Sequence, residues 1–270
     1  ELQKHGMEPG TCPEELNVTH PELVQSIHKD YFDAGSDIVE TNSFGGTSIR
    51  LAAHQFEKRV KEFSKKAAEN AKAVCPLGKF VAGSIGPTGL MLEPFGDLSI
   101  SKAYDSFAEQ MEALAEGGVD LFFLETMMSI EEAETAVRAA KEKTNLITAA
   151  TMTFDSGLRT MWGVDIPTAV QRLTDAGADI IGSNCGRGFD EMVEVISEMK
   201  NYTAKPILAQ ANAGLPQFIN GANVYKETPE VILPKVEKLI SCGVKIIGGC
   251  CGTNPLHIKA MRTLLDKVNL

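Results

Sequence analysis

The fold of this chain is decided by the stretch AGADIIGSNC, residues 176–185. A glycine follows an amphipathic pattern that is typical of a helix, and it precedes a short apolar run that is typical of a buried strand. Glycine readily takes the left-handed backbone conformation that ends a helix. The stretch therefore predicts a helix exit and then a buried strand, whose last residues are the polar pair Asn184 and Cys185.

The same helix exit occurs at three other places, so that four glycines share this role: Gly35, Gly118, Gly177 and Gly243. One further strand-like run lies between each glycine and the next, which means that the motif marks every second strand. Strands and helices that alternate along a chain of this length favour a (β/α)8 TIM barrel, whose usual size is about 250 residues. An open, doubly wound sheet is the competing α/β fold.

Seven apolar runs of strand length are predicted, at residues 37–44, 80–85, 120–126, 146–154, 179–185, 206–212 and 244–250. Amphipathic patterns predict helices at residues 21–34, 48–74, 101–116, 130–142, 166–176, 190–200, 229–241 and 255–267. An eight-stranded barrel needs one more strand before the first helix, and residues 1–19 hold no suitable run. We expect that strand upstream of residue 1, and a seven-stranded barrel with a gap is the alternative. No linker divides residues 1–270, which indicates a single domain.

Composition narrows the class of protein. The chain has 270 residues, 43% of them hydrophobic, and a net charge of −10 without a basic cluster. This balance argues against nucleic acid or an anionic membrane as a partner, and no apolar run is long enough to span a bilayer. The six cysteines are too sparse for a disulfide scaffold. They favour a reducing, cytoplasmic setting and a role in metal binding or catalysis.

Three of the cysteines are expected at one end of the barrel. Cys185 ends one strand, while Cys250 and Cys251 end another inside the sequence GGCCG, and both strands carry the glycine exit. Zinc binds thiolates in tetrahedral geometry, and catalytic zinc sites keep one position open. The trio therefore predicts a zinc site with an open position. The alternatives are buried cysteines that only fill space and a strained vicinal disulfide with a regulatory role.

Polar residues at the same strand ends are candidates for substrate binding. Glu125 closes an apolar run, where a carboxylate is costly to bury unless it is paired. We interpret it as an anchor for a substrate ammonium group, with a structural ion pair as the alternative. Asn42 either lines the pocket or lies near the cap of the next helix. Asn184 either supports the cysteines or takes the empty metal position.

Two motifs resemble the zinc-binding signature of the homocysteine S-methyltransferase family. They are GSNCG at residues 182–186 and GGCCGT at residues 248–253. Four more stretches resemble the cobalamin-dependent, methionine-synthase-like branch of that family. These are ETNSFG at residues 40–45, GPTG at 86–89, ET at 125–126 and NAGLP at 212–216.

The resemblance implies a barrel in which Cys185, Cys250 and Cys251 hold Zn²⁺. It implies that Glu125 binds the amino group of homocysteine, and we expect Asn42, Thr126 and Asn184 to line the same substrate site. The resemblance also implies a loop after the first strand, and the backbone amides of this loop bind the substrate carboxylate.

The implied reaction is methylation of homocysteine to methionine, in which the zinc-bound substrate thiolate attacks the methyl group. The implied donor is methylcobalamin on a corrinoid protein or domain, and S-methylmethionine and betaine are alternatives within the family. A non-catalytic zinc- or redox-sensing barrel is a rival from another class. A zinc-free barrel that acts on phosphorylated or pterin substrates is a second rival.

Overall fold

Seven parallel strands form one curved sheet in a computed structural model that describes residues 1–8, 10–155, 157–219 and 222–267. The strands are β1 (Ile38–Glu40), β2 (Phe80–Ile85), β3 (Leu121–Met127), β4 (Ile147–Met152), β5 (Ile180–Cys185), β6 (Ile207–Ala211) and β9 (Ile246–Gly249). Their order in the sheet follows their order in the chain. This sequential order is that of a barrel and rules out the doubly wound sheet, in which the order reverses at a switch point.

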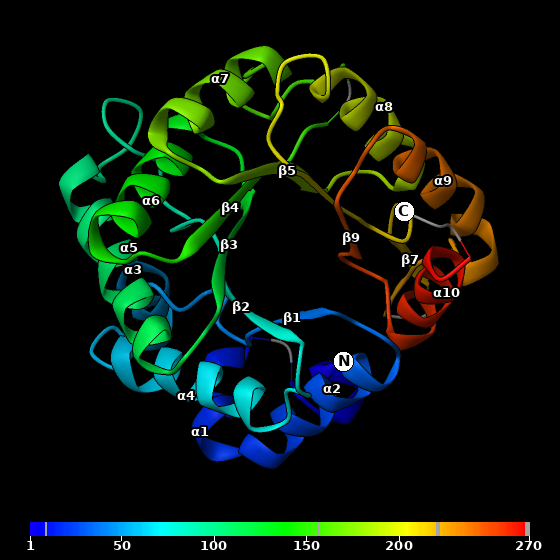
Figure 1. Cartoon of the computed structure of the whole chain (residues 1–270). Coiled ribbons are helices and arrows are strands. Elements are labelled where there is room, and N and C mark those ends of the chain that lie inside the picture. Colours follow the sequence, from blue (N-terminus) through cyan, green and yellow to red (C-terminus); the bar gives the residue numbers. More distant parts are fainter. Residues whose placement is uncertain (9, 156, 220–221, 268–270) are drawn as a thin grey trace.

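Helices surround the strands as an outer ring (Figure 1). The longer ones are α2 (Pro21–Asp33), α4 (Val60–Ala73), α5 (Ile100–Glu116), α6 (Ile130–Lys143), α7 (Ile166–Ala176), α8 (Phe189–Met199), α9 (Pro229–Ser241) and α10 (Pro255–Leu265). The short ones are η1 (Leu2–His5), η2 (Pro13–Glu15), α1 (Leu16–Thr19), α3 (Ser48–Leu51) and η3 (Ala52–His54). None of the helices in the described part of the chain is both long and apolar enough to cross a bilayer.

The four glycine exits have the predicted conformation. Gly35, Gly118, Gly177 and Gly243 have φ values of 104°, 94°, 102° and 89°. They precede β1, β3, β5 and β9, which are alternate strands of the sheet. The predicted strand parity is thus confirmed, and it brings the polar ends of these strands to one side of the molecule.

Two predicted elements differ clearly in extent from the observed ones, and a new element lies at the carboxyl end of the barrel. The single helix expected at 48–74 is interrupted after η3, where Gln55 takes a left-handed φ of 62°. The interruption lets Phe56 pack edge-on against Phe63 of α4, with ring centroids 5.4 Å apart. The strand expected at 37–44 ends at Glu40, because the chain turns so that the Ser43 amide donates to the Thr41 carbonyl.

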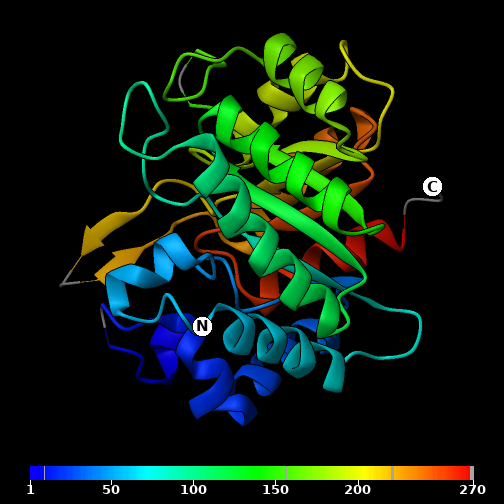
Figure 2. The ribbon, with the colours of Figure 1, turned by 90° about the vertical axis from the view of Figure 1, so that its left-hand side faces the viewer.

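The new element is a two-stranded hairpin of β7 (Gln217–Ile219) and β8 (Ala222–Val224), which lies within the connection from β6 to α9. Figure 2 shows it projecting from the body on the side where α3 lies. Since α3 follows the carboxyl end of β1, the hairpin belongs to the end of the barrel that carries the cysteines.

The barrel interior is apolar toward the amino ends of the strands and polar toward their carboxyl ends. A compact inner cluster contains Ala82, Leu121, Phe123, Ala149, Ile180 and Leu208, with Ile38 and Ile246 packed against it. Residues two positions further along a strand point to the same face. The next inward residues therefore include Glu40, Ser84, Thr151 and Gln210, and these polar side chains form the floor of any site at the carboxyl end.

A cavity of about 630 Å³ lies between the two terminal strands of the sheet, β1 and β9. Its lining extends from Asp37 and Lys245 at their amino ends to Asn42 and Cys250 at their carboxyl ends. Helices α2 and α10 cover it from outside, and Arg262 on α10 binds Asp37 with an Nη1–Oδ2 distance of 2.9 Å. The position between β1 and β9 is the place that an eighth strand would occupy.

His28 on α2 lines this cavity and predicts an acid-sensitive stability. Its side chain is 6% exposed, Nε2 has no hydrogen-bond partner among the described residues, and burial lowers its pKa to about 4. The unfolded chain takes up a proton near pH 6.5, whereas the folded chain does so only near pH 4. The contribution of His28 to stability is therefore full above pH 6.5 and falls by about 3 kcal/mol as the pH drops from 6.5 to 4. The free energy of unfolding of metal-free wild type and of His28→Leu is measured with urea at both pH values. Between pH 6.5 and pH 4, the difference between the two proteins should shift by that amount in favour of the variant. An unchanged difference would contradict this account.

Candidate active site

Three thiols converge at the carboxyl end of the barrel. The Sγ atoms of Cys185, Cys250 and Cys251 all lie within 4.8 Å of one another, and those of Cys185 and Cys250 are 3.0 Å apart. No other group of three His, Cys, Asp or Glu residues in the described part of the chain is placed to hold one metal ion. Cys185 has a left-handed φ of 62°, which turns the chain at the end of β5. The arrangement brings together the three predicted ligands.

The loops that carry the cysteines are fixed by Asn212 and by close packing at two glycines. Asn212 accepts a hydrogen bond from the Cys251 amide (2.9 Å) and donates one to the Gly186 carbonyl (2.7 Å). A Cβ atom at Gly249 would lie 2.3 Å from Thr253 Oγ1, and one at Gly252 would lie 2.2 Å from the Tyr225 ring. A larger side chain at either position would have to displace Thr253 or Tyr225, which pack beside the cysteine pair.

The charge of the thiol cluster suits a metal ion. Hydrogen bonds from the thiols of Cys185 and Cys250 lower the pKa of Cys251 to about 3. The hydrogen bond to Cys185 is the main cause that raises the pKa of Cys250. One thiolate is thus favoured without metal, and a divalent cation would displace the remaining protons. Three cysteine thiolates that converge on one point are soft ligands of the kind that Zn²⁺ takes, and they would leave its fourth position for another ligand.

Asn184 holds the thiol cluster against the neighbouring strand. Its side chain is fully buried, and Oδ1 accepts hydrogen bonds from the Thr126 amide and the Thr151 hydroxyl, both at 2.7 Å. Nδ2 donates to Thr126 Oγ1 at 2.8 Å and lies 3.8 Å from Cys185 Sγ and 4.0 Å from Cys250 Sγ. Of the two roles predicted for Asn184, this geometry favours support of the cysteines over occupation of the empty metal position.

Replacement of Asn184 by alanine should weaken metal binding without removing a ligand. Residues that orient metal ligands typically contribute a factor of about 10 to 100 in metal affinity. The change would also leave the Thr126 amide without its partner, which should cost about 1–3 kcal/mol of stability. Zinc affinity is measured by competition with a chelator, and Asn201→Ala on the exposed end of α8 is the control. Equal affinities of the two variants would contradict the assigned role.

A second polar group, next to the thiols, contains two carboxyl groups. Glu125 is 8% exposed and accepts a hydrogen bond from Ser84 Oγ at 2.5 Å. Burial raises its pKa well above the usual range, and the adjacent carboxylate of Glu40 raises it further. Glu40 in turn accepts a hydrogen bond of 2.5 Å from Nε2 of Gln210 on β6. Neither carboxyl group has a basic partner in the described part of the chain, so the predicted alternative of a structural ion pair finds no support.

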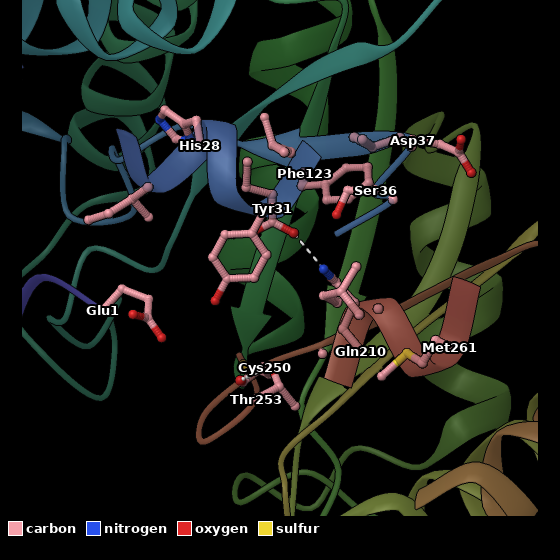
Figure 3. A pocket seen from close by; sticks show the side chains of 18 of the residues that line it. Glu1, His28, Tyr31, Ser36, Asp37, Phe123, Gln210, Cys250, Thr253 and Met261 are labelled. Carbon is pink, nitrogen blue, oxygen red and sulfur yellow. Dashed lines mark hydrogen bonds between the residues drawn. The ribbon is translucent and has the colours of Figure 1, made fainter. Parts of the chain in front are cut away.

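Glu40, Gln210 and Cys250 line the same cavity. Figure 3 shows Gln210 and Cys250 at its wall together with Tyr31 from α2, and the dashed line is the hydrogen bond of Gln210 to Glu40. An occupant of the carboxyl end of this cavity can therefore contact the carboxyl group of Glu40 and the thiol of Cys250.

The other predicted residues lie nearby, with different surroundings. Thr126 has a left-handed φ of 61° and its hydroxyl lies 3.9 Å from Cys185 Sγ. Asn42 lines the cavity, but its amide nitrogen donates to the Pro13 carbonyl at 2.7 Å. Substrate binding by these residues stays a prediction. Glu40 and Gln210 were not among the predicted site residues, although both lie two positions beyond an inward apolar residue, which was the available signal.

Comparisons with known proteins agree with this geometry. Residues 1–265 match the family described as homocysteine S-methyltransferase. The chain is 30% identical over 269 residues to methionine synthase of Mycobacterium tuberculosis (strain ATCC 25618 / H37Rv), covering 95% of this chain and 22% of that protein. It is 27% identical over 270 residues to methionine synthase of Mycobacterium leprae (strain TN), again spanning 22% of that protein's length.

Among solved structures, the metallated form of the homocysteine methyltransferase MmuM from Escherichia coli has the same fold. It superposes with a TM-score of 0.82 at 23% identity, covering 97% of this chain and 92% of that one. The predicted resemblance is confirmed by the family match over nearly the whole chain. The chain belongs to the homocysteine S-methyltransferase family.

Proposed function

We propose that this chain binds homocysteine at a zinc ion held by Cys185, Cys250 and Cys251 and methylates its sulfur to give methionine. The observation that carries the proposal is the convergence of three thiols, with Sγ atoms within 4.8 Å, beside a cavity that the carboxylate of Glu40 also lines. A thiol that carries an amine is the class of substrate that matches both groups. The similarity to homocysteine methyltransferases supports the choice of homocysteine.

Zinc bound by the three thiolates would supply a position at which a substrate thiol loses its proton and stays nucleophilic near neutral pH. The residues of the chain bind and orient this substrate. Glu125 and Glu40 would attract the ammonium group, while Asn184 and Asn212 hold the cysteine loops in place. Positioning of the nucleophile in line with the methyl group is the main contribution expected from the protein.

The methyl donor belongs to the same proposal. We infer methylcobalamin on a corrinoid protein or domain, because both curated relatives are methionine synthases more than four times as long as the matched region. A reducing, cytoplasmic setting would keep the three thiols available for metal. Methionine formation from homocysteine is followed by mass spectrometry with methylcobalamin, S-methylmethionine and betaine as separate donors. Formation with methylcobalamin alone supports the proposal, and no methionine from zinc-loaded protein with any donor contradicts it.

We also propose that a complete barrel has an eighth strand between β1 and β9, as the strand count predicted for a segment before residue 1. The support is the cavity that runs along both terminal strands. Hydrogen exchange provides the test. When a segment that supplies a strand is added before residue 1, exchange of the amides of β1 (Ile38–Glu40) and β9 (Ile246–Gly249) should slow together. Unchanged exchange in either strand would contradict insertion between them.

A further inference from the structure

We infer that Glu40 contacts the substrate ammonium group, and that it forms a two-carboxylate clamp with Glu125, positioned by Gln210. The inference rests on the proposed function and extends it. Glu40 lines the cavity, whereas Glu125 is nearly fully buried and lies in contact with Glu40. Glu40 and Glu125 each lie two positions beyond an inward apolar residue, so both carboxyl groups remain on the inner wall of the barrel when a strand fills the gap between β1 and β9.

The number of free acceptors fits an ammonium group. The two carboxyl groups are in contact and have no basic partner in the described ranges. Each accepts one hydrogen bond, from the Ser84 hydroxyl or the Gln210 amide, and has further acceptor sites. In addition, Oε1 of Gln210 is buried and accepts no hydrogen bond from the described residues. An ammonium group donates three hydrogen bonds, and Glu40, Glu125 and Gln210 offer one acceptor each.

The position of Gln210 relative to the thiols fits a short aminothiol. A Cβ atom built on Gly248 would lie 3.1 Å from Gln210 Cγ and 3.3 Å from Nε2, so the amide lies directly against β9 at that residue. Cys250 follows two residues later, which is about 7 Å along a strand. A thiol at the metal and an amine at the clamp are thus separated by the length of a short carbon chain.

Charge also selects for a cation at this point. Burial and then repulsion by the adjacent carboxylate of Glu40 disfavour the charged form of Glu125. An ammonium group placed between the two carboxyl groups removes this repulsion, and a neutral or anionic group does not. The clamp therefore distinguishes aminothiols from thiols without an amine, and the preference should depend on both carboxyl groups.

The test is a binding experiment on the cobalt-substituted protein, in which thiolate coordination gives a charge-transfer absorption. Homocysteine and 4-sulfanylbutanoate, which lacks only the amino group, are titrated against wild type, Glu40→Gln, Glu40→Gln with Glu125→Gln, and the control Glu69→Gln on the exposed face of α4. Loss of one hydrogen bond to a charged group should reduce the preference for homocysteine about tenfold or more in Glu40→Gln. The double variant should bind both thiols alike, with affinity for 4-sulfanylbutanoate retained throughout.

The outcomes separate the two proposals. If wild type and Glu40→Gln prefer homocysteine equally, Glu40 does not contact the amine and the inference is wrong, while the proposed function stands. If the wild-type cobalt protein responds to neither thiol, the proposed function is wrong and the clamp is wrong with it. Equal loss of affinity for both thiols in Glu40→Gln would show general damage to the site and would also overturn the clamp.

Discussion

Replacing Cys251 with alanine is expected to remove bound zinc and abolish methyl transfer. Cys251 is one of three thiols that lie within 4.8 Å of one another, and it carries the charge that the other two thiols stabilise. Binding of a structural zinc ion contributes on the order of 10–16 kcal/mol in small zinc-binding peptides. Loss of one ligand in three should therefore lower affinity by many orders of magnitude. Zinc content after dialysis should fall from one ion per chain to nearly none.

The matched control is Cys75→Ala. Cys75 is half-buried beyond the end of α4, outside the group of thiols that could hold a metal. This variant should keep one zinc ion and full activity. The Cys251→Ala chain should remain folded by circular dichroism, because the exposed side chain of Cys251 lies in a loop at the rim. Methyl transfer that persists in zinc-free Cys251→Ala would refute the zinc site.

Replacing Glu125 with glutamine is expected to weaken homocysteine binding while zinc remains bound. Hydrogen bonds to charged groups contribute about 1.5–3 kcal/mol, which corresponds to a loss of roughly 10- to 100-fold in affinity. Calorimetric titration of homocysteine into zinc-loaded wild type and Glu125→Gln measures this difference. Equal binding constants would exclude Glu125 from the amine site.

The same variant should be more stable than wild type when no ligand is present. The folded-state pKa of Glu125 lies well above its unfolded value, so wild type loses stability as the pH rises from the unfolded pKa toward the folded pKa. Glutamine has no proton to lose, and the advantage of Glu125→Gln should therefore increase over that range. Urea unfolding at pH 5 and pH 8 tests the sign, with Glu69→Gln as the exposed control. A variant that is less stable than wild type at both values would contradict it.

The sequence was sufficient to predict the strand parity and the convergence of the three cysteines. Glycine positions such as Gly177 and Gly243 decide the helix exits locally, because few other residues take that backbone conformation. Counting from them placed Cys185, Cys250 and Cys251 at one level, and the structure brings their sulfur atoms together. The predicted bounds of β2 and β5 also agree closely with the observed ones, since both strands are short apolar runs with clear ends.

Other features depend on contacts that no local pattern encodes. The break between η3 and α4 arises because Phe56 packs on Phe63, a preference that helical periodicity alone does not contain. The link from Gln210 to Glu40 joins residues that are 170 positions apart. Such pairs become visible only when the register of each strand is known, because a shift of one residue would turn either side chain outward.

The most direct test of the central claim is X-ray absorption at the zinc edge, before and after homocysteine is added. The account predicts a zinc ion with three sulfur ligands at about 2.3 Å in the protein alone, and four when homocysteine is bound. The Cys251→Ala variant should give almost no signal at the zinc edge, because it retains almost no zinc. A spectrum that keeps three sulfur ligands in the presence of saturating homocysteine would contradict binding of the substrate thiolate to zinc.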